Sequence, residues 1–277
     1  MTDTAPDTLE NLELTLLLEG VFQQYGYDFR HYAVASIKRR VLARLAEEKL
    51  ATVSELQARL LHDPAAFERF LLGLTVHVTA LFRDPGFYQA LRAQAVPWLR
   101  TYPFVRLWVA GCSTGEEVYS LAILLQEETL YDRCRIYATD LGETVLAKAK
   151  AGIFPLASMQ EYSDNYFKAG GQQSFSEYYT ASHDHAILSP ALRRNVLFAQ
   201  HNLVTDASFN EFHLVLCRNV MIYFDKTLQD RVHQLLYDSL APLGLLGLGR
   251  NESLRFTPCE SGYEEVDAQE RIYRKKR

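Results

Sequence analysis

Cysteine is scarce in this sequence, and its spacing excludes the usual cysteine-based sites. The four cysteines among 277 residues include no pair with the two-residue spacing of a zinc site. We therefore expect neither a metal centre nor a disulfide framework. No apolar run approaches the roughly 18 residues that span a bilayer. The first ten residues are acidic and polar, unlike a signal peptide. These absences favour a soluble, cytoplasmic protein that does not insert into a membrane.

A phosphate-binding loop is missing as well, although a glycine-containing turn stands where one would occur. In residues 105–127 an apolar run leads into small residues from Gly111 to Gly115, then into Glu116 and Glu117, then into a helical pattern. This order predicts a buried parallel strand, a tight loop and a helix. The loop lacks the Lys-Ser/Thr of a P-loop, and its carboxylates would repel phosphate. We expect a ligand with hydroxyls, an amine or a positive centre. The alternative is an ordinary strand–helix turn whose glutamates stabilise the helix dipole.

A second acidic residue strengthens the case for a nucleotide-like ligand. Residues 135–140 predict another strand that ends in Asp140, about one βαβ unit after the glycines. In doubly wound folds an acid at this position binds ribose hydroxyls. The Gly-x-x-x-Gly spacing differs from the G-x-G-x-x-G of NAD-binding loops. Residues 262–275 have the pattern of a polar-tipped antiparallel hairpin. A parallel sheet completed by such a hairpin resembles the α/β, Rossmann-like class I S-adenosylmethionine (SAM) methyltransferases.

The chain divides into a helical part, residues 1–85, and an α/β part, residues 86–277. Thr52 and Glu55 have the spacing of a capping box in the first part. Strands and helices alternate from Val105 onward, which predicts a parallel sheet. Residues 163–191 break this alternation, and we expect a small antiparallel β insertion there. The predicted helices cover residues 12–25, 32–49, 52–61 and 64–74 and begin again at residue 85, and the later strands cover residues 195–202, 212–217 and 244–249.

A basic segment stands out in a chain whose net charge is −5. Residues 30–44 contain no acid and carry an apolar stripe at helical spacing. Arg39, Arg40 and Arg44 project off the stripe, whereas Lys38 lies within it and would have to extend toward solvent. A solvated helix face explains this pattern. Nucleic-acid binding is disfavoured because the chain is acidic overall and the segment has no interleaved aromatics.

Three blocks of residues together resemble the CheR family, SAM-dependent methyltransferases that esterify glutamates of bacterial chemoreceptors. The blocks are residues 78–84 (VTALFRD), 112–120 (CSTGEEVYS) and 217–224 (CRNVMIYF), and they occur in the family's order and spacing. The resemblance runs from about Tyr25 to the C-terminus. It implies a class I SAM-methyltransferase fold with an all-α N-terminal domain, SAM as cofactor and S-adenosylhomocysteine (SAH) as product.

The resemblance also implies a partner, the cytoplasmic domain of a chemoreceptor. In this family a basic N-terminal helix is thought to dock the acidic, helical methylation region of the receptor. This assigns partner binding to Lys38, Arg39, Arg40 and Arg44. Family members carry a β-subdomain near residues 163–191, which in some binds a tethering peptide at the receptor's C-terminus. A flap over the cofactor is the alternative here. We expect a monomer that binds no nucleic acid.

Carried over residue by residue, the resemblance implies a set of site residues. Arg83 and Tyr223 match residues proposed to act at the methyl-transfer centre, where Arg83 would hold the acceptor carboxylate and Tyr223 would orient an oxygen. The sequence departs from the pattern at His77, where the family often has asparagine. The residues that would contact SAM are His77, Thr79, Arg83, Gly111, Glu117, Asp140, Asn202, Leu203, Arg218 and Asn219.

Two other functions stay open at this point. One is a non-catalytic regulator that binds SAM or SAH, and the other is a methyltransferase with a different, small acceptor. Arg83 together with Tyr223 argues against the first, because a regulator needs no grip on an acceptor. The basic helix argues against the second, because a small acceptor needs no docking surface. Structural roles are also open: Arg83 pairing with Asp84 or Glu117, and Tyr223 as a core aromatic.

Overall fold

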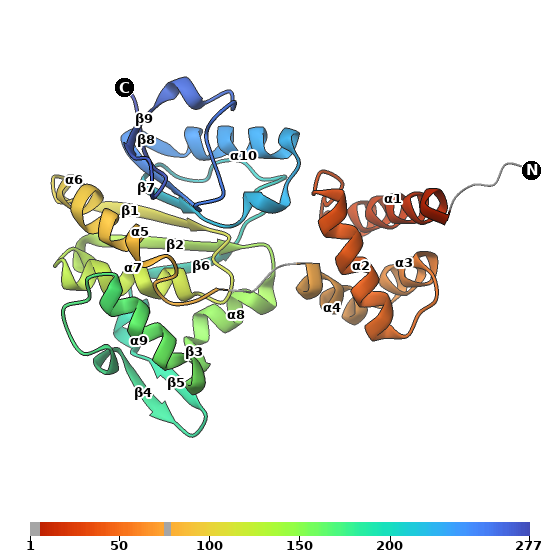
Figure 1. Ribbon diagram of the computed structural model, residues 1–277, viewed down its shortest axis with the longest axis horizontal. Helices are drawn as coiled ribbons and strands as arrows, with labels where there is room; N and C mark the ends of the chain where they lie inside the picture. Colours follow the sequence, from red (N-terminus) through yellow and green to blue (C-terminus); the bar gives the residue numbers. More distant parts are fainter. Residues whose placement is uncertain (1–5, 75–78) are drawn as a thin grey trace, which may run out of the picture. The chain divides into compact units, whose positions relative to one another are not determined.

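The computed structural model describes residues 6–74 and 79–277 (Figure 1). Contacts divide the chain into two compact units. The helical unit comprises Met1–Val76 together with Tyr223–Gln229, and the α/β unit comprises His77–Ile222 and Asp230–Arg277. This division lies upstream of the domain boundary expected at residue 85, and that boundary stays a prediction.

The helical unit is built on four amphipathic or apolar helices, α1 (Pro6–Tyr25), α2 (Val34–Glu48), α3 (Val53–His62) and α4 (Pro64–Leu74). Each buries apolar residues at helical spacing, for example Ile37, Val41 and Leu45 of α2. The capping box at the start of α3 is confirmed. The Glu55 N–H donates to Thr52 Oγ1 at 3.2 Å, and the Glu55 carboxylate accepts from the Thr52 N–H at 3.2 Å.

A segment from far along the chain completes the helical unit. The Ala33 N–H donates to the Tyr223 carbonyl at 2.8 Å, and the Asp225 N–H donates to the His31 carbonyl at 2.8 Å. Tyr32 and Phe224 form an antiparallel bridge and pack with ring centroids 4.8 Å apart. Tyr223 ends a short 3₁₀ helix, η6 (Met221–Tyr223), and α10 (Lys226–Asp238) follows.

The α/β unit is organised around a seven-stranded sheet of order β6-β2-β1-β7-β8-β10-β9. The first five of these strands are parallel, and β10 is antiparallel to both β8 and β9. Their bounds are β1 (Val105–Ala110), β2 (Cys134–Asp140), β6 (Val196–Gln200), β7 (Phe212–Cys217), β8 (Leu240–Leu248), β9 (Tyr263–Asp267) and β10 (Ile272–Lys275). The predicted class I methyltransferase fold with its closing hairpin is confirmed.

Helices cover both faces of this sheet, and Figure 1 shows α7 and α10 on opposite sides of it. Central strand β7 is buried along its whole length, as expected for a strand covered on both faces. The helix predicted from residue 85 is interrupted by a π-helical turn, Leu91–Ala95, just before Pro97, which has no N–H to continue the helical ladder. The helices of this unit are α5 (Pro85–Ala90), α6 (Val96–Leu99), α7 (Glu116–Glu127), α8 (Glu143–Ala151) and α9 (Met159–Lys168), followed by α10.

The antiparallel insertion exists, but its predicted start was wrong. Residues 163–168 belong to α9, because Met159, Tyr162 and Tyr166 are buried at helical spacing. The small sheet instead has the order β3-β5-β4 and recruits β3 from before α9. Its strands are β3 (Ile153–Pro155), β4 (Tyr179–Ser182) and β5 (His185–Leu188). Short 3₁₀ turns are η2 (Tyr131–Arg133), η3 (Leu156–Ser158), η4 (Phe175–Tyr178), η5 (Pro190–Arg193) and η7 (Glu260–Gly262).

Candidate functional site

The carboxyl ends of the parallel strands bring several predicted residues to one edge of the sheet. The register pairs Ala110 with Thr139 and Asp140 with Gln200, so β1, β2 and β6 end level with one another. On the other side of β1, Val109 pairs with Leu216 of β7. The strand order reverses between β1 and β7, and ligands of open α/β sheets bind in the crevice at such a point.

The glycine turn after β1 is required by close packing of the protein itself. Gly111 has φ +71°, and a Cβ there would lie 2.6 Å from a methyl group of Val220. Gly115 has φ +98° at the N-cap of α7, where a Cβ would lie 3.1 Å from Ala149. Both positions therefore need glycine for their backbone conformation and for neighbouring protein atoms. The predicted contact of Gly111 with the cofactor stays a prediction.

Asp140 joins the glycine turn to the end of β2. It is 9% exposed, and its carboxylate accepts from the Ser113 N–H and the Leu141 N–H, each at 2.8 Å. A carboxylate held by backbone donors is fixed in direction and still has acceptor capacity on each oxygen. Such a group suits ribose hydroxyls, and this role of Asp140 stays a prediction.

Arg218 is the centre of a buried ion-pair network at the end of β7. Its guanidinium donates to Glu117 at 2.7 Å and to Asp84 at 2.8 Å, and its side chain is 3% exposed. It also lies over the Phe87 ring, 3.9 Å from the centroid. Burial, the largest single effect, opposes the charge, but Glu117, Tyr88 and Asp84 together outweigh it and raise the pKa of Arg218. The network joins the three sequence blocks in one cluster, because Arg218 pairs with both Asp84 and Glu117.

The segment that carries Arg83 is held in an unusual backbone conformation. Phe82 and Asp84, on either side of Arg83, have φ +53° and +56°. Phe82 is fully buried, and its N–H donates to Ser120 Oγ at 2.8 Å. The amide of Asn165 donates to the Leu81 carbonyl at 3.2 Å. Left-handed backbone costs free energy for these residue types, so the segment persists because α7 and α9 hold it. Arg83 and Thr79 are half-buried, and His77 lies outside the described residues.

Glu252 is a site residue that the sequence reasoning missed. Its buried carboxylate accepts from four backbone N–H groups, those of Asn219, Val220, Met221 and Gly249, at 2.7–2.9 Å. Burial raises the pKa of this carboxyl, against the effect of the N–H donors. Glu252 thereby fixes the backbone that follows Arg218. The available signal was an acid placed shortly after a glycine-containing strand end, similar to Asp140.

Asn202 and Leu203 form the turn at the end of β6. The Asn202 N–H donates to Asp206 at 2.8 Å, and its side-chain oxygen accepts from the Val204 N–H at 2.9 Å. Leu203 is 8% exposed. The two residues thus have a local structural role, and their proposed contact with adenine stays a prediction. Asn219, the remaining member of the predicted set, has φ +60°.

Tyr223 and the basic residues of α2 belong to the helical unit. Arg40 lies over the Tyr223 ring, 4.7 Å from its centroid, so Tyr223 has an aromatic packing role at least. Lys38 pairs with Glu10 at 3.4 Å, and Arg44 pairs with Glu47 at 2.8 Å. Arg39 is exposed and makes no ion pair within the described part of the chain. The four predicted docking cations therefore differ strongly in how far they are available to a partner.

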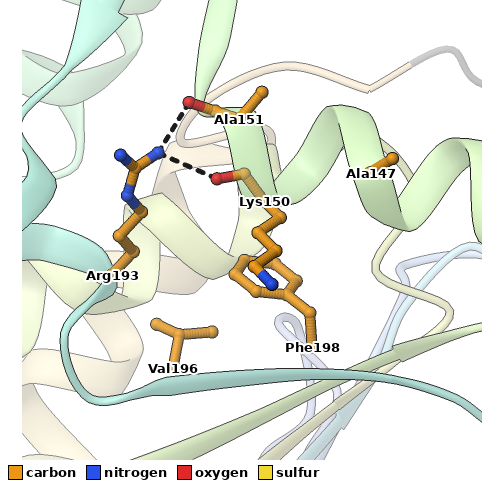
Figure 2. Close-up of a pocket in the computed structure, with 6 residues that line it drawn as sticks. All are labelled: Ala147, Lys150, Ala151, Arg193, Val196 and Phe198. Carbon is orange, nitrogen blue, oxygen red and sulfur yellow. Dashed lines mark hydrogen bonds between the residues drawn. The ribbon is translucent and has the colours of Figure 1, made fainter.

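A surface pocket of about 550 Å³ lies elsewhere, between α8, η5 and the outer strand β6 (Figure 2). Arg193 lines it and donates to the Lys150 and Ala151 carbonyls at 2.9 and 2.8 Å, which caps the C-terminus of α8. Val196 pairs with Ile136 in β2, toward the amino end of that strand. The pocket is therefore distant along the strands from the edge that carries Asp140.

Metal-binding clusters and membrane-spanning helices are absent from the part of the chain that the structure describes. Within residues 6–74 and 79–277, no three His, Cys, Asp or Glu side chains are grouped so that they could hold a metal ion. No helix in this described part is both long and apolar enough to cross a membrane.

Proteins with similar sequences cover nearly the whole chain. The family domain described as CheR methyltransferase, SAM binding domain, matches residues 77–269, and the CheR methyltransferase, all-alpha domain, matches residues 12–75. Cher3 of Pseudomonas putida is 50% identical over 96% of this chain and 97% of its own length. The chemotaxis protein methyltransferase of Listeria innocua is 31% identical over 87% of this chain and 90% of its own length. The solved N-methyltransferase NodS of Bradyrhizobium japonicum aligns with 71% of this chain and 97% of that chain, at 15% identity and a TM-score of 0.37.

Proposed function

This chain belongs to the CheR family of SAM-dependent methyltransferases, and we propose that its methyl acceptor is a glutamate side chain of a bacterial chemoreceptor. Family membership rests on the match of both CheR domains, which together span residues 12–75 and 77–269. The observation that carries the proposal is the Arg218 network, because it gathers the family's three sequence blocks into one cluster at the carboxyl edge of the sheet. The product is a glutamate methyl ester, with SAH released, in chemosensory adaptation.

The residues at this edge fit SAM by their chemistry. Bound SAM supplies an electrophilic methyl group on a positively charged sulfur. Asp140 and Glu117 are carboxylates, suited to ribose hydroxyls and to positive charge, whereas a phosphate-bearing cofactor would be repelled. We assign the methionine side of the cofactor to Thr79, Arg218 and Asn219, the ribose to Asp140, and the adenine to Asn202 and Leu203.

Catalysis of this methyl transfer depends more on alignment of the acceptor and the cofactor than on stabilisation of charge in the transition state. A carboxylate and a sulfonium neutralise each other during transfer, so no strong base and no oxyanion hole are needed. The protein must exclude water and hold the acceptor oxygen in line with the methyl group. We assign the hold on the acceptor to Arg83, whose planar guanidinium can grip a carboxylate with two hydrogen bonds, and the orientation of its oxygen to Tyr223.

We further propose that α2 docks the acidic methylation region of the receptor, and that the protein acts as a monomer without a nucleic-acid partner. Lys38, Arg39, Arg40 and Arg44 bring positive charge to one helix of an otherwise acidic chain.

Transfer of labelled methyl from SAM to a chemoreceptor cytoplasmic fragment tests the proposal. We expect label that is released as methanol by alkali, which is diagnostic of a carboxyl methyl ester. Label that resists alkali would assign a different acceptor group. Tight SAM binding without transfer to any receptor fragment would favour a non-catalytic regulator.

A further inference from the structure

Phe256 is a large apolar side chain that the fold leaves in solvent. It is 87% exposed, more than any other large hydrophobic residue of the described chain. Its φ is +63°, in the left-handed region that is unfavourable for most residues other than glycine. Glycine or asparagine would adopt this backbone more readily. A phenylalanine here therefore has an unfavourable backbone and an unfavourable exposure at the same position.

The loop around Phe256 is held firmly. The Phe256 N–H donates to Glu260 at 2.7 Å, and Thr257 Oγ1 donates to the Leu254 carbonyl at 2.7 Å. Leu254 and Cys259, on either side, are buried at 3% and 6% exposure. Residues 254–259 thus form a loop that is fixed by buried Leu254 and Cys259 and exposes Arg255 and Phe256 at its tip. Such a tip can present a side chain to a partner with little loss of conformational entropy.

The loop begins at the candidate site. It follows β8, whose last residue, Leu248, pairs with Cys217 immediately before Arg218. Glu252 then binds the backbone of Asn219, Val220 and Met221. Phe256 is four positions after Glu252 in the chain, so their Cα atoms are within about 14 Å of one another. An acceptor protein whose glutamate reaches this edge of the sheet would pass within range of the tip.

We propose that Phe256 and its neighbour Arg255 form an acceptor-binding tip, which contacts the receptor helix beside the methylated glutamate. This inference rests on the proposed function. The ring would pack on apolar helix residues, and Arg255 would meet the acidic side chains of the methylation region. Arg255 is exposed and has no ion pair among the residues that the structure describes, so its charge is available. Aromatic and arginine side chains are the residue types that most often dominate protein interfaces.

Phe256→Asn separates this role from a structural one. Asparagine tolerates the left-handed backbone, so we expect the melting temperature to stay equal or rise, with an unchanged Kd for SAM. The KM for a receptor fragment should rise about tenfold or more, while kcat changes little. The matched control is Phe104→Ala, since Phe104 is 50% exposed and precedes the amino end of β1, at the opposite edge of the sheet. This control should leave the KM unchanged.

An unchanged KM in Phe256→Asn, with the wild type active on the receptor, would overturn the tip while leaving the proposed function intact. An equal rise in both variants would also overturn it, because the effect would then not depend on position. If the wild-type protein methylates no receptor fragment, the proposed function fails and the tip fails with it.

Discussion

Arg83 is placed by its neighbours, since Phe82 is anchored to Ser120 and Asp84 to Arg218. Its own side chain is half-buried. A guanidinium with a fixed base can bind a carboxylate at little entropic cost. The segment therefore has the properties required of an acceptor grip.

We predict that Arg83→Ala lowers the rate of receptor methylation by about 100-fold or more, because the acceptor carboxylate loses its alignment. SAM affinity should fall only several-fold. Single-turnover methyl transfer and equilibrium SAM binding measure the two effects. Arg83→Lys keeps the charge but not the two-point grip, and should give an intermediate rate. Wild-type turnover in Arg83→Ala would remove Arg83 from the catalytic assignment.

Glu116 and Glu117 are adjacent in sequence but have opposite environments. Glu116 is buried and its carboxyl accepts a hydrogen bond from the Thr114 hydroxyl at 2.6 Å, and burial raises the pKa of this carboxyl. Glu117 is paired with buried Arg218. A raised folded-state pKa means that the folded protein binds the proton more tightly than the unfolded chain. The contribution of protonated Glu116 to the free energy of unfolding is therefore present at low pH and is lost as the pH rises through its folded-state pKa.

We therefore predict that Glu116→Gln increases the free energy of unfolding at pH 7.5, with the gain shrinking as the pH falls toward 4.5, because the raised pKa lets the folded wild type bind a proton at Glu116. Glu117→Gln is the opposite control. It should cost about 3 kcal/mol at pH 7.5, because it leaves the buried Arg218 charge less compensated. Urea unfolding at the two pH values measures both variants. A loss of stability in Glu116→Gln at pH 7.5 would contradict the burial argument.

At the scale of single elements, the basic side chains of α2 differ in how many contacts they make within the protein. Arg44 donates to the Arg69 carbonyl and pairs with Glu47, whereas Arg39 is exposed and makes no ion pair among the described residues. Charge reversal at Arg44 would therefore disturb the fold as well as any docking. Arg39 offers the cleaner test of the docking proposal.

We predict that Arg39→Glu raises the KM for a receptor fragment by about three- to tenfold, with unchanged stability and SAM affinity, because the substitution opposes charge complementarity at an exposed position. The effect should weaken as ionic strength rises. Arg44→Glu should lower the melting temperature. If Arg39→Glu has wild-type kinetics at low salt, α2 does not dock the acceptor through this residue.

At the scale of the whole molecule, the cofactor should be coupled to stability. A ligand that binds only the folded state adds about 2.7 kcal/mol to the free energy of unfolding at 100 times its Kd. We predict this increase for SAM, and a smaller one for Asp140→Asn at the same SAM concentration, because the amide loses acceptor capacity at the end of β2. Differential scanning calorimetry with and without SAM measures it. Equal stabilisation of the two proteins would show that Asp140 does not contact the cofactor.

Sequence patterns predicted much of this molecule because they act locally. The periodicity of residues 64–74 and the Thr52–Glu55 spacing defined α4 and the start of α3, which the structure confirms. Alternating apolar runs and turns likewise predicted the central strands, and strand ends marked Asp140 and the glycine turn. The failure at residues 163–168 came from aromatic side chains that suit either a strand or a buried helix face.

The sequence alone determined the fold class, the family resemblance and the residues at the strand ends, since each depends on order and spacing along the chain. Only the tertiary structure decided which charges meet. Arg218 pairs with Glu117, 101 residues away, and Glu252 binds the backbone after β7 from 33 residues away. The tertiary structure also brings Tyr223 against Arg40 of α2 and leaves Phe256 exposed on a hydrogen-bonded loop. Such contacts depend on which surfaces the folded chain brings together, and no local pattern encodes them.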